Sequence, residues 1–387
     1  MRILFFNHQF LPSTNEADDI THRLLSEFAK NPEIHADLVT FSIDGKERVL
    51  KMGGNITIHE IPNKNKNSDS NSGILKQGWQ MYKYAKKLAK MNSYDLIHSF
   101  SLVPFGFACR RLGKKINVPF IISLRASDVI ANQARPGFLH NTVAKKIIEA
   151  WESASFIVAS SQWLASVELK SKPLRKISII YNGVDTKYFS PNPDKKKADD
   201  VFTVVCSLPF ESENGIRFLI QAFNILIRRY ENLRLVIMGD GRERASLEQL
   251  AMGLNLDKKV IFTGIIPQEK MLEYYQSASI FVSPSLRENF EKSIVEALAC
   301  GLPVVATDVG AAREFVEDTE NGFIVEPRNS YQMAENIEKF LLDSKLAEKM
   351  GEKSREFSEK IDWERVAGKY FDLYKKTADV SRIEKEE

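Results

Sequence analysis

The sequence predicts an α/β protein with two consecutive domains, each a doubly wound, mostly parallel sheet with helices on both faces. Short apolar runs alternate with amphipathic segments along the whole chain, and strands that alternate with helices form parallel sheets through right-handed crossovers. The apolar runs carry Ile, Val, Leu or Phe on both faces, as strands covered on two sides do. The chain has 387 residues, more than one hydrophobic core usually serves.

The elements of the first half follow from these runs and the amphipathic segments between them. The expected strands are Ile3–Asn7, Ala36–Phe41, Ile56–Ile61, Leu96–Ser99, Phe120–Leu124, Phe156–Ser160 and Ile177–Tyr181. The expected helices are Asp19–Lys30, Leu75–Asn92, Phe105–Leu112, Thr142–Ala154 and Ser161–Lys170.

The second half repeats the pattern after a linker, Ser190–Asp200, which has two prolines, a basic run and no apolar periodicity. Its expected strands are Val201–Ser207, Arg234–Met238, Val260–Thr263, Ile280–Ser283, Val304–Thr307 and Phe323–Val325. Its expected helices are Gly215–Tyr230, Glu243–Met252, Gln268–Ser277, Lys292–Cys300 and Tyr331–Asp343.

Composition excludes several classes of protein. The formal net charge is only +3, so charge gives no reason to expect a nucleic-acid partner. Cys109, Cys206 and Cys300 are far apart and lie in apolar runs, which indicates buried free thiols in a reducing compartment. No stretch approaches the roughly 20 apolar residues that span a bilayer. We therefore expect a soluble, cytoplasmic protein.

The segment Pro284–Gly310 carries the most chemical information. A strand that ends at Ser283 leads through a turn with Glu288 into a helix with Glu296. At about 1.5 Å per residue the two carboxylates lie roughly 12 Å apart along the axis, about the length of a sugar joined through a diphosphate to a ribose. The helix N-terminus between them is a suitable anion site, and carboxylates are strong acceptors for hydroxyl groups. The alternative is a surface loop residue and a solvated helix position.

The sequence PSLRENFEKSIVEALACGLPVVATDVG in this segment closely resembles the donor-binding signature of family-4 glycosyltransferases, retaining enzymes of the two-domain GT-B fold. The resemblance extends over nearly the whole chain. Further matching segments are Asp95–Gly106, Ser123–Val129, Ile179–Pro191, Arg234–Ala251, Val260–Ser285, Glu320–Pro327 and the last helix, Ile361–Tyr374. The resemblance implies an acceptor-side domain over residues 1–190, a nucleotide-sugar domain over 191–360, and a helix over 361–387 that crosses back to the first domain.

The resemblance also implies an activity and a site. The activity is transfer of a sugar from a UDP- or GDP-linked donor, with no metal and no other cofactor, to a glycan or lipid-linked acceptor, in a cleft where the two domains face each other. By this likeness Glu296 holds the ribose, and Glu288 holds sugar hydroxyls with the help of backbone N–H groups near Asn289 and Phe290. The loop with Gly264 and Ile265 contacts the base.

Four matches to the family fail near the donor phosphates. Asn15 and Glu16 stand where a glycine-rich turn is expected, and side chains keep the backbone farther from a phosphate. Ser207 and Asn214 stand where an arginine and a lysine are expected, and Glu211 and Glu213 add negative charge. A diphosphate without a cation in a cleft is unfavourable by several kcal/mol. Arg217, Lys292 or Arg287 can replace the missing cations.

The other two departures have two interpretations each. Glu291 replaces a glycine at the start of the signature helix; it either competes with phosphate for the helix dipole or simply stabilises the helix. Arg125, before Asp128, stands where many members have a histidine; it either stabilises the leaving phosphate or forms a structural ion pair. We expect Glu288, Arg125 and Asp128 to act at the reaction centre. The alternative is a non-catalytic partner protein that keeps the fold.

Two further features have structural and functional interpretations. Residues 75–90 place Leu75, Trp79, Tyr82, Ala85 and Leu88 on one helical stripe with lysines around it. This pattern is typical of a helix on a membrane surface, here the inner face, and equally of a helix packed on a sheet. His98 ends a strand, where a structural role is favoured over a role in the cleft.

Overall fold

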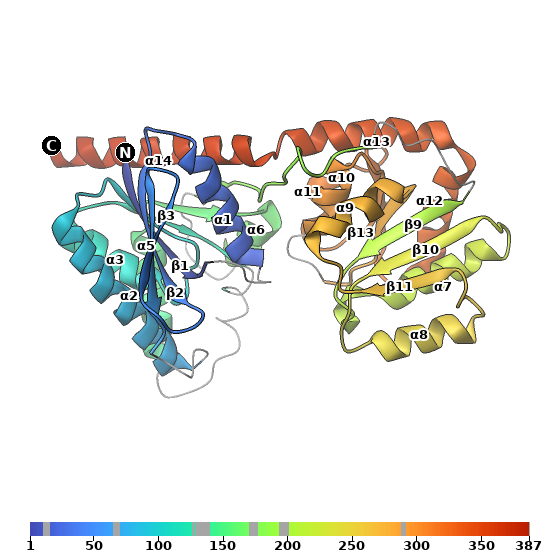
Figure 1. Ribbon diagram of the computed structural model, residues 1–387, viewed down its shortest axis with the longest axis horizontal. Coiled ribbons are helices and arrows are strands. Elements are labelled where there is room, and N and C mark those ends of the chain that lie inside the picture. Colours follow the sequence, from blue (N-terminus) through green and yellow to red (C-terminus); the bar gives the residue numbers. More distant parts are fainter. Residues whose placement is uncertain are drawn as a thin grey trace. The chain divides into compact units, whose positions relative to one another are not determined.

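The computed structural model of the chain describes residues 1–10, 16–64, 70–125, 128, 140–169, 177–192, 201–287 and 292–386. The chain forms two units, which are described separately (Figure 1). Unit 1 contains Met1–Gly183 and Trp363–Glu387, and unit 2 contains Val184–Asp362. Of the expected linker, residues 193–200 lie outside the described residues.

Unit 1 contains an eight-stranded sheet in the order β3-β4-β2-β1-β5-β6-β7-β8. All neighbouring strands are parallel except β3 and β4. The bounds are β1 Arg2–Gln9, β2 His35–Ser42, β3 Arg48–Met52, β4 Ile56–Pro62, β5 Leu96–Ser99, β6 Phe120–Ser123, β7 Phe156–Ala159 and β8 Ile177–Ile179. The expected strands of this half are confirmed. The sequence did not predict β3, because this edge strand has no buried face and so no apolar alternation.

Helices cover both faces of this sheet, as the apolar strands predict. Their bounds are α1 Glu16–Ala29, α2 Asn71–Met91, α3 Gly106–Ile116, α5 His140–Ser153, α6 Gln162–Leu169 and α14 Trp363–Glu386. Buried side chains of α2, α3, α5 and α6 form one hydrophobic cluster with the sheet. Those of α1 and α14 form a second cluster with the sheet.

The last helix is held to unit 1 by a buried histidine. His98 of β5 is fully buried; its Nδ1 lies 2.7 Å from the Tyr374 hydroxyl and its Nε2 lies 2.9 Å from the Ser123 hydroxyl. Burial lowers the pKa of His98 to about 3, so this imidazole is neutral and its contacts pin α14 to the strands. The structural interpretation of His98 is confirmed.

Unit 2 contains a six-stranded parallel sheet in the order β11-β10-β9-β12-β13-β14. The strands are β9 Phe202–Ser207, β10 Leu233–Met238, β11 Val260–Gly264, β12 Ile280–Ser283, β13 Val304–Thr307 and β14 Gly322–Val325. The helices are α7 Ile216–Ile227, α8 Arg244–Gly253, α9 Gln268–Ser277, α10 Lys292–Ala299, α11 Ala312–Phe315, α12 Ser330–Leu342 and α13 Ser344–Glu359. Helices α7 and α8 lie on one side of the sheet and α9 and α10 on the other (Figure 1). This is the arrangement of a Rossmann-like domain.

The boundary between the units falls before residue 190. The N–H of Val184 donates to the carbonyl of Ile361. The Asp362 carboxylate accepts hydrogen bonds from the N–H and the hydroxyl of Thr186, at 3.2 and 2.5 Å. The Arg355 guanidinium donates to the carbonyls of Thr186 and Phe189. These bonds place residues 184–190 in unit 2.

Candidate functional site

The strand order of unit 2 marks the place where a ligand would bind. Strands β9 and β12 are neighbours in the middle of the sheet, and the chain continues from them toward opposite edges. In open parallel sheets, ligands bind outside the carboxyl ends of the two strands at such a switch point. Here those ends are Ser207 and Ser283. The loop after each strand leads into a helix, α7 after β9 and α10 after β12 (Figure 1).

The two loops at the switch point pack directly against each other. The N–H of Leu286 donates to the carbonyl of Glu213 at 2.8 Å. Gly215, which precedes α7, has a φ of +62°, and a Cβ there would lie 2.2 Å from the carbonyl oxygen of Pro284. The close approach of the loops therefore requires a glycine at this position.

Replacing Gly215 with alanine is expected to cost about 2 to 4 kcal/mol of stability, because it combines a left-handed conformation with a clash against backbone. Unfolding followed by far-UV circular dichroism measures this loss. The matched control is Gly253→Ala at the end of α8, where a Cβ would meet nothing within 4 Å. Equal stability of Gly215→Ala and the control would contradict the packing described above.

A buried carboxylate lies on the helix that follows β12. Glu296 of α10 is only 3% exposed. Its Oε2 accepts a hydrogen bond from the Tyr275 hydroxyl at 3.0 Å, and its Oε1 lies 3.8 Å from the Lys292 Nζ, one helical turn earlier. Ser207 hydrogen-bonds the same tyrosine. Burial and the Glu296 charge raise the pKa of Tyr275. The interpretation of Glu296 as a solvated helix position is therefore wrong.

The two residues in place of the expected cations are engaged within unit 2. Ser207 hydrogen-bonds Tyr275, and the Asn214 side chain donates to the carbonyl of Pro209 at 2.7 Å. Of the acids predicted beside them, Glu213 is exposed, and Glu211 lies 4.0 Å from the guanidinium of Arg242.

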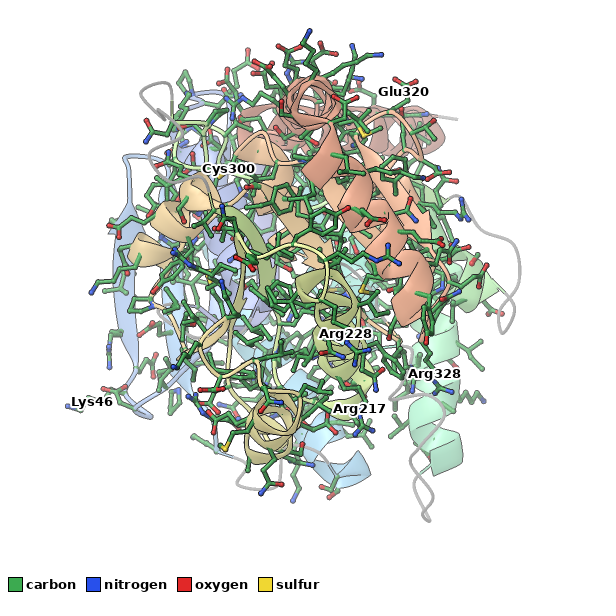
Figure 2. All side chains as sticks on the ribbon, turned by 90° about the vertical axis from the view of Figure 1, so that its right-hand side faces the viewer. Lys46, Arg217, Arg228, Cys300, Glu320 and Arg328 are labelled. Atoms are coloured by element: carbon green, nitrogen blue, oxygen red, sulfur yellow. The ribbon has the colours of Figure 1, made fainter. Side chains whose placement is uncertain are left out.

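The candidate replacements for these cations differ in their surroundings. Lys292 lies beside Glu296, whereas Arg217 is exposed on the first turn of α7. Figure 2 shows Arg217 on the first turn of α7 and Arg228 at the end of the same helix. Arg287, at the end of the described loop after β12, is also exposed.

Several predicted site residues have no described placement. Glu288, Asn289, Phe290 and Glu291 lie outside the described residues, as does Asn15. Of Glu16, only the backbone, in the first turn of α1, is described.

The predicted base-contacting loop follows β11. Gly264 ends that strand, and its carbonyl accepts a hydrogen bond from the Gly239 N–H at 3.0 Å. The next residue, Ile265, is 81% exposed. At the switch point, the buried hydroxyls of Ser283 and Ser285 find no hydrogen-bond partner in the part of the chain that the structure describes. At the carboxyl edge of the sheet, Ile265 thus presents exposed apolar surface, and the two serine hydroxyls are available to hydrogen-bond a ligand.

Unit 1 places Arg125 at the carboxyl ends of its own strands. The Arg125 guanidinium donates to the carbonyl of Phe100 and, at 2.7 Å, to the side-chain oxygen of Asn7. Asn7 is fully buried and donates in turn to the hydroxyl of Thr21. Strand β1 and the loops after β5 and β6 therefore meet at this arginine. The sequence analysis missed Asn7, because a single asparagine at a strand end gives no distinctive signal.

Asp128 is a buried carboxylate that ties two of these loops together. It is 1% exposed and accepts hydrogen bonds from the backbone N–H groups of Leu102, Val103 and Arg125 at 3.0–3.1 Å. Burial raises the pKa of Asp128, and these hydrogen bonds act in the opposite direction. The carboxylate thus sets the path of the backbone that carries Arg125.

Comparison with known proteins shows the same two parts. The family model described as Glycosyltransferase Family 4 matches residues 20–188, and the model described as Glycosyl transferases group 1 matches residues 190–357. The chain belongs to these glycosyltransferases. The uncharacterised glycosyltransferase MJ1607 of Methanocaldococcus jannaschii is 27% identical over 319 residues, which are 77% of this chain and 80% of that protein.

Solved structures show that this glycosyltransferase has the GT-B fold. Sucrose-phosphate synthase from Thermosynechococcus elongatus aligns with a TM-score of 0.77 at 22% identity, over 97% of this chain and 98% of that one. HepE from Anabaena in complex with UDP aligns with a TM-score of 0.75 at 18% identity, over 97% of this chain and all of that one. The fold predicted from the signature segment is confirmed.

Proposed function

We propose that this glycosyltransferase takes its sugar from a UDP- or GDP-linked donor and transfers it, with retention of anomeric configuration, to a glycan or lipid-linked acceptor. The observation that carries the proposal is Glu296, a carboxylate held at the switch point of a Rossmann-like sheet by Tyr275 and Lys292. A carboxylate so placed is a strong acceptor for ribose hydroxyls. The structurally similar HepE has been solved in complex with UDP, which supports a nucleotide as the ligand.

The remaining residues divide between donor and reaction centre. Lys292, with Arg217 as a second candidate, would neutralise phosphate charge, and Gly264 and Ile265 would contact the base. Glu288, with the backbone of Asn289 and Phe290, would hold the sugar hydroxyls. Arg125, which Asn7 and Phe100 orient, would stabilise the leaving phosphate, while Asp128 would act by positioning Arg125.

Isothermal titration calorimetry with a panel of nucleotides tests donor binding. UDP or GDP is expected to bind with a Kd in the micromolar range, about −8 kcal/mol, and the affinity is expected to be unchanged by EDTA. In a donor-hydrolysis assay, NMR should show that the sugar is first released in the anomeric configuration of the donor. A first product of inverted configuration would contradict retention.

A second candidate function is that of a non-catalytic partner with the same fold. The observation in its favour is that Ser207 and Asn214, at the two expected cation positions, are uncharged and engaged within unit 2. This candidate predicts that no nucleotide in the panel is bound and that the protein co-purifies with an active transferase. Micromolar binding of one nucleotide diphosphate, together with slow donor hydrolysis, would exclude it.

A further inference from the structure

Three helices on one face of unit 1 line an open pocket of about 450 Å³. This volume is typical of sites for small molecules. The pocket lies between α2, α3 and α5, and its lining residues are Leu75, Lys76, Trp79, Phe107, Arg110, Arg111, Lys114, Lys146 and Glu149. None of them belongs to strand β1 or to the loops after β5 and β6 that meet at Arg125. The pocket is therefore separate from the candidate reaction centre.

The apolar stripe of α2 has two parts, one buried in the core of unit 1 and one that lines the pocket. Tyr82, Ala85 and Leu88 are buried in the core, as the packed-helix interpretation predicts. Leu75 and Trp79 instead line the pocket, and Trp79 remains 38% exposed. No described helix has the length and apolarity needed to cross a membrane. The exposed part of the stripe is thus a concave wall and not a continuous apolar face.

The apolar wall is closely packed. Gly78 lets α2 approach α3 closely, because a Cβ there would lie 2.4 Å from the Phe107 ring and 2.6 Å from the carbonyl of Pro104. The rings of Trp79 and Tyr82 stack with centroids 5.1 Å apart. The Arg111 guanidinium lies over both rings, at 4.5 and 5.2 Å. An arginine held in this way loses little further entropy when a ligand binds.

The pocket carries five cationic side chains and one carboxylate. The carboxylate, Glu149, pairs with Arg110 at 2.9 Å. Of the other cations, Arg111 stacks on Trp79, and the Nζ of Lys146 lies 5.7 Å from the centre of the Phe107 ring. No ion pair with an acid is found for Lys76, Arg111, Lys114 or Lys146 within the described ranges. A dianionic group that enters the pocket would meet several cations and an aromatic wall together.

We propose that this pocket binds a phosphate ester of an apolar group, with the phosphate on Arg111, Lys114 and Lys146 and the apolar body against Trp79 and Phe107. Guanidinium and ammonium groups form charge-assisted hydrogen bonds to phosphate, and the flat aromatic wall accounts for the apolar part of the ligand. The ester can be a soluble molecule or the headgroup region of a lipid. Both sources present the same chemistry to these side chains.

Calorimetric titration of the full chain with octyl phosphate, below its micelle concentration, tests the site. The wild type is expected to bind octyl phosphate at least tenfold more tightly than inorganic phosphate, and octanol is expected not to bind. Arg111→Gln/Lys146→Gln should weaken octyl phosphate binding at least tenfold. Trp79→Ala should weaken octyl phosphate binding several-fold and inorganic phosphate binding less, because it removes the apolar contact in addition to the ring that supports Arg111.

The matched control is Lys87→Gln/Lys115→Gln, which removes the same charge from exposed positions of α2 and α3 outside the pocket. It should change the affinity less than twofold. The substituted side chains are exposed or half-buried, so each variant is expected to fold. Tryptophan fluorescence can check this. Equal affinity of wild type for inorganic and octyl phosphate, equal loss in pocket and control variants, or no binding of octyl phosphate would overturn the proposal.

Flotation with phosphatidylcholine vesicles that contain phosphatidic acid tests whether the phosphate ester is a lipid headgroup or a soluble molecule. Binding to these vesicles that Trp79→Ala and Arg111→Gln/Lys146→Gln abolish, and the control retains, would support the proposal and identify a lipid headgroup as the source. Octyl phosphate binding without vesicle binding would support the proposal and identify a soluble ester as the ligand. Vesicle binding that the control weakens as much as the pocket variants would indicate a diffusely charged surface and overturn it.

Discussion

Replacing Glu296 with glutamine is expected to weaken UDP or GDP binding about 2- to 30-fold. The variant keeps the size of the side chain and an oxygen that can accept from Tyr275. It removes the charge, and hydrogen bonds to a charged acceptor are worth about 1.5–3 kcal/mol against about 1 for neutral ones. Isothermal titration of wild type and variant with the same nucleotide measures the loss.

The matched control for this experiment is Glu335→Gln on the exposed face of α12, which makes the same change of charge in unit 2. Its nucleotide affinity should stay within twofold of wild type. Tyr275→Phe removes one donor from the carboxylate and should give a smaller loss than Glu296→Gln. An unchanged affinity of Glu296→Gln, for a nucleotide that the wild type binds, would exclude Glu296 from the donor site.

Acidification is expected to destabilise unit 1 through His98. The pKa of this histidine is lowered from 6.5 to about 3 in the folded protein, so below pH 6.5 the unfolded chain binds a proton that the folded chain does not. Its contribution to stability is complete above pH 6.5 and is lost as the pH falls toward 3. Between pH 6.5 and 4.5 the loss is about 2 to 3 kcal/mol, at 1.36 kcal/mol per pH unit.

Urea unfolding at several pH values, followed by tryptophan fluorescence, measures this effect. All four tryptophans, Trp79, Trp151, Trp163 and Trp363, belong to unit 1, so the signal reports that unit alone. His98→Gln is expected to be less stable than wild type at pH 7 and to lose about 2 to 3 kcal/mol less on acidification. The same pH dependence in wild type and variant would show that His98 does not cause it.

The fold was predictable because most of its strands are buried on both faces. Runs such as Phe156–Ala159 and Val304–Thr307 are apolar at nearly every position, and the structure buries all of them. The strand Arg48–Met52 and the single-turn helix Ala312–Phe315 gave no such signal, since one is exposed and the other is too short for periodicity. Periodicity detects an element only when the element buries an apolar face.

Only the part of the site that lies in the signature segment, Pro284–Gly310, was predictable from the sequence. The spacing from Ser283 to Glu296 placed the glutamate correctly on the helix after the strand, but its burial depends on Tyr275, which a sequence cannot distinguish from an ordinary core tyrosine. The cations illustrate the same limit. Lys292 is four residues before Glu296 on one expected helix, so their contact was predictable, whereas the exposure of Arg217 and Arg287 was not.

Hydrogen exchange with and without UDP or GDP tests most directly whether the switch point of unit 2 binds the donor nucleotide. We expect slower exchange of backbone amides in Cys206–Gly215 and Lys292–Cys300, and no change in α2, α3 and α5, which line the separate pocket. Protection confined to unit 1, or no protection with either nucleotide at concentrations that saturate related transferases, would contradict this expectation.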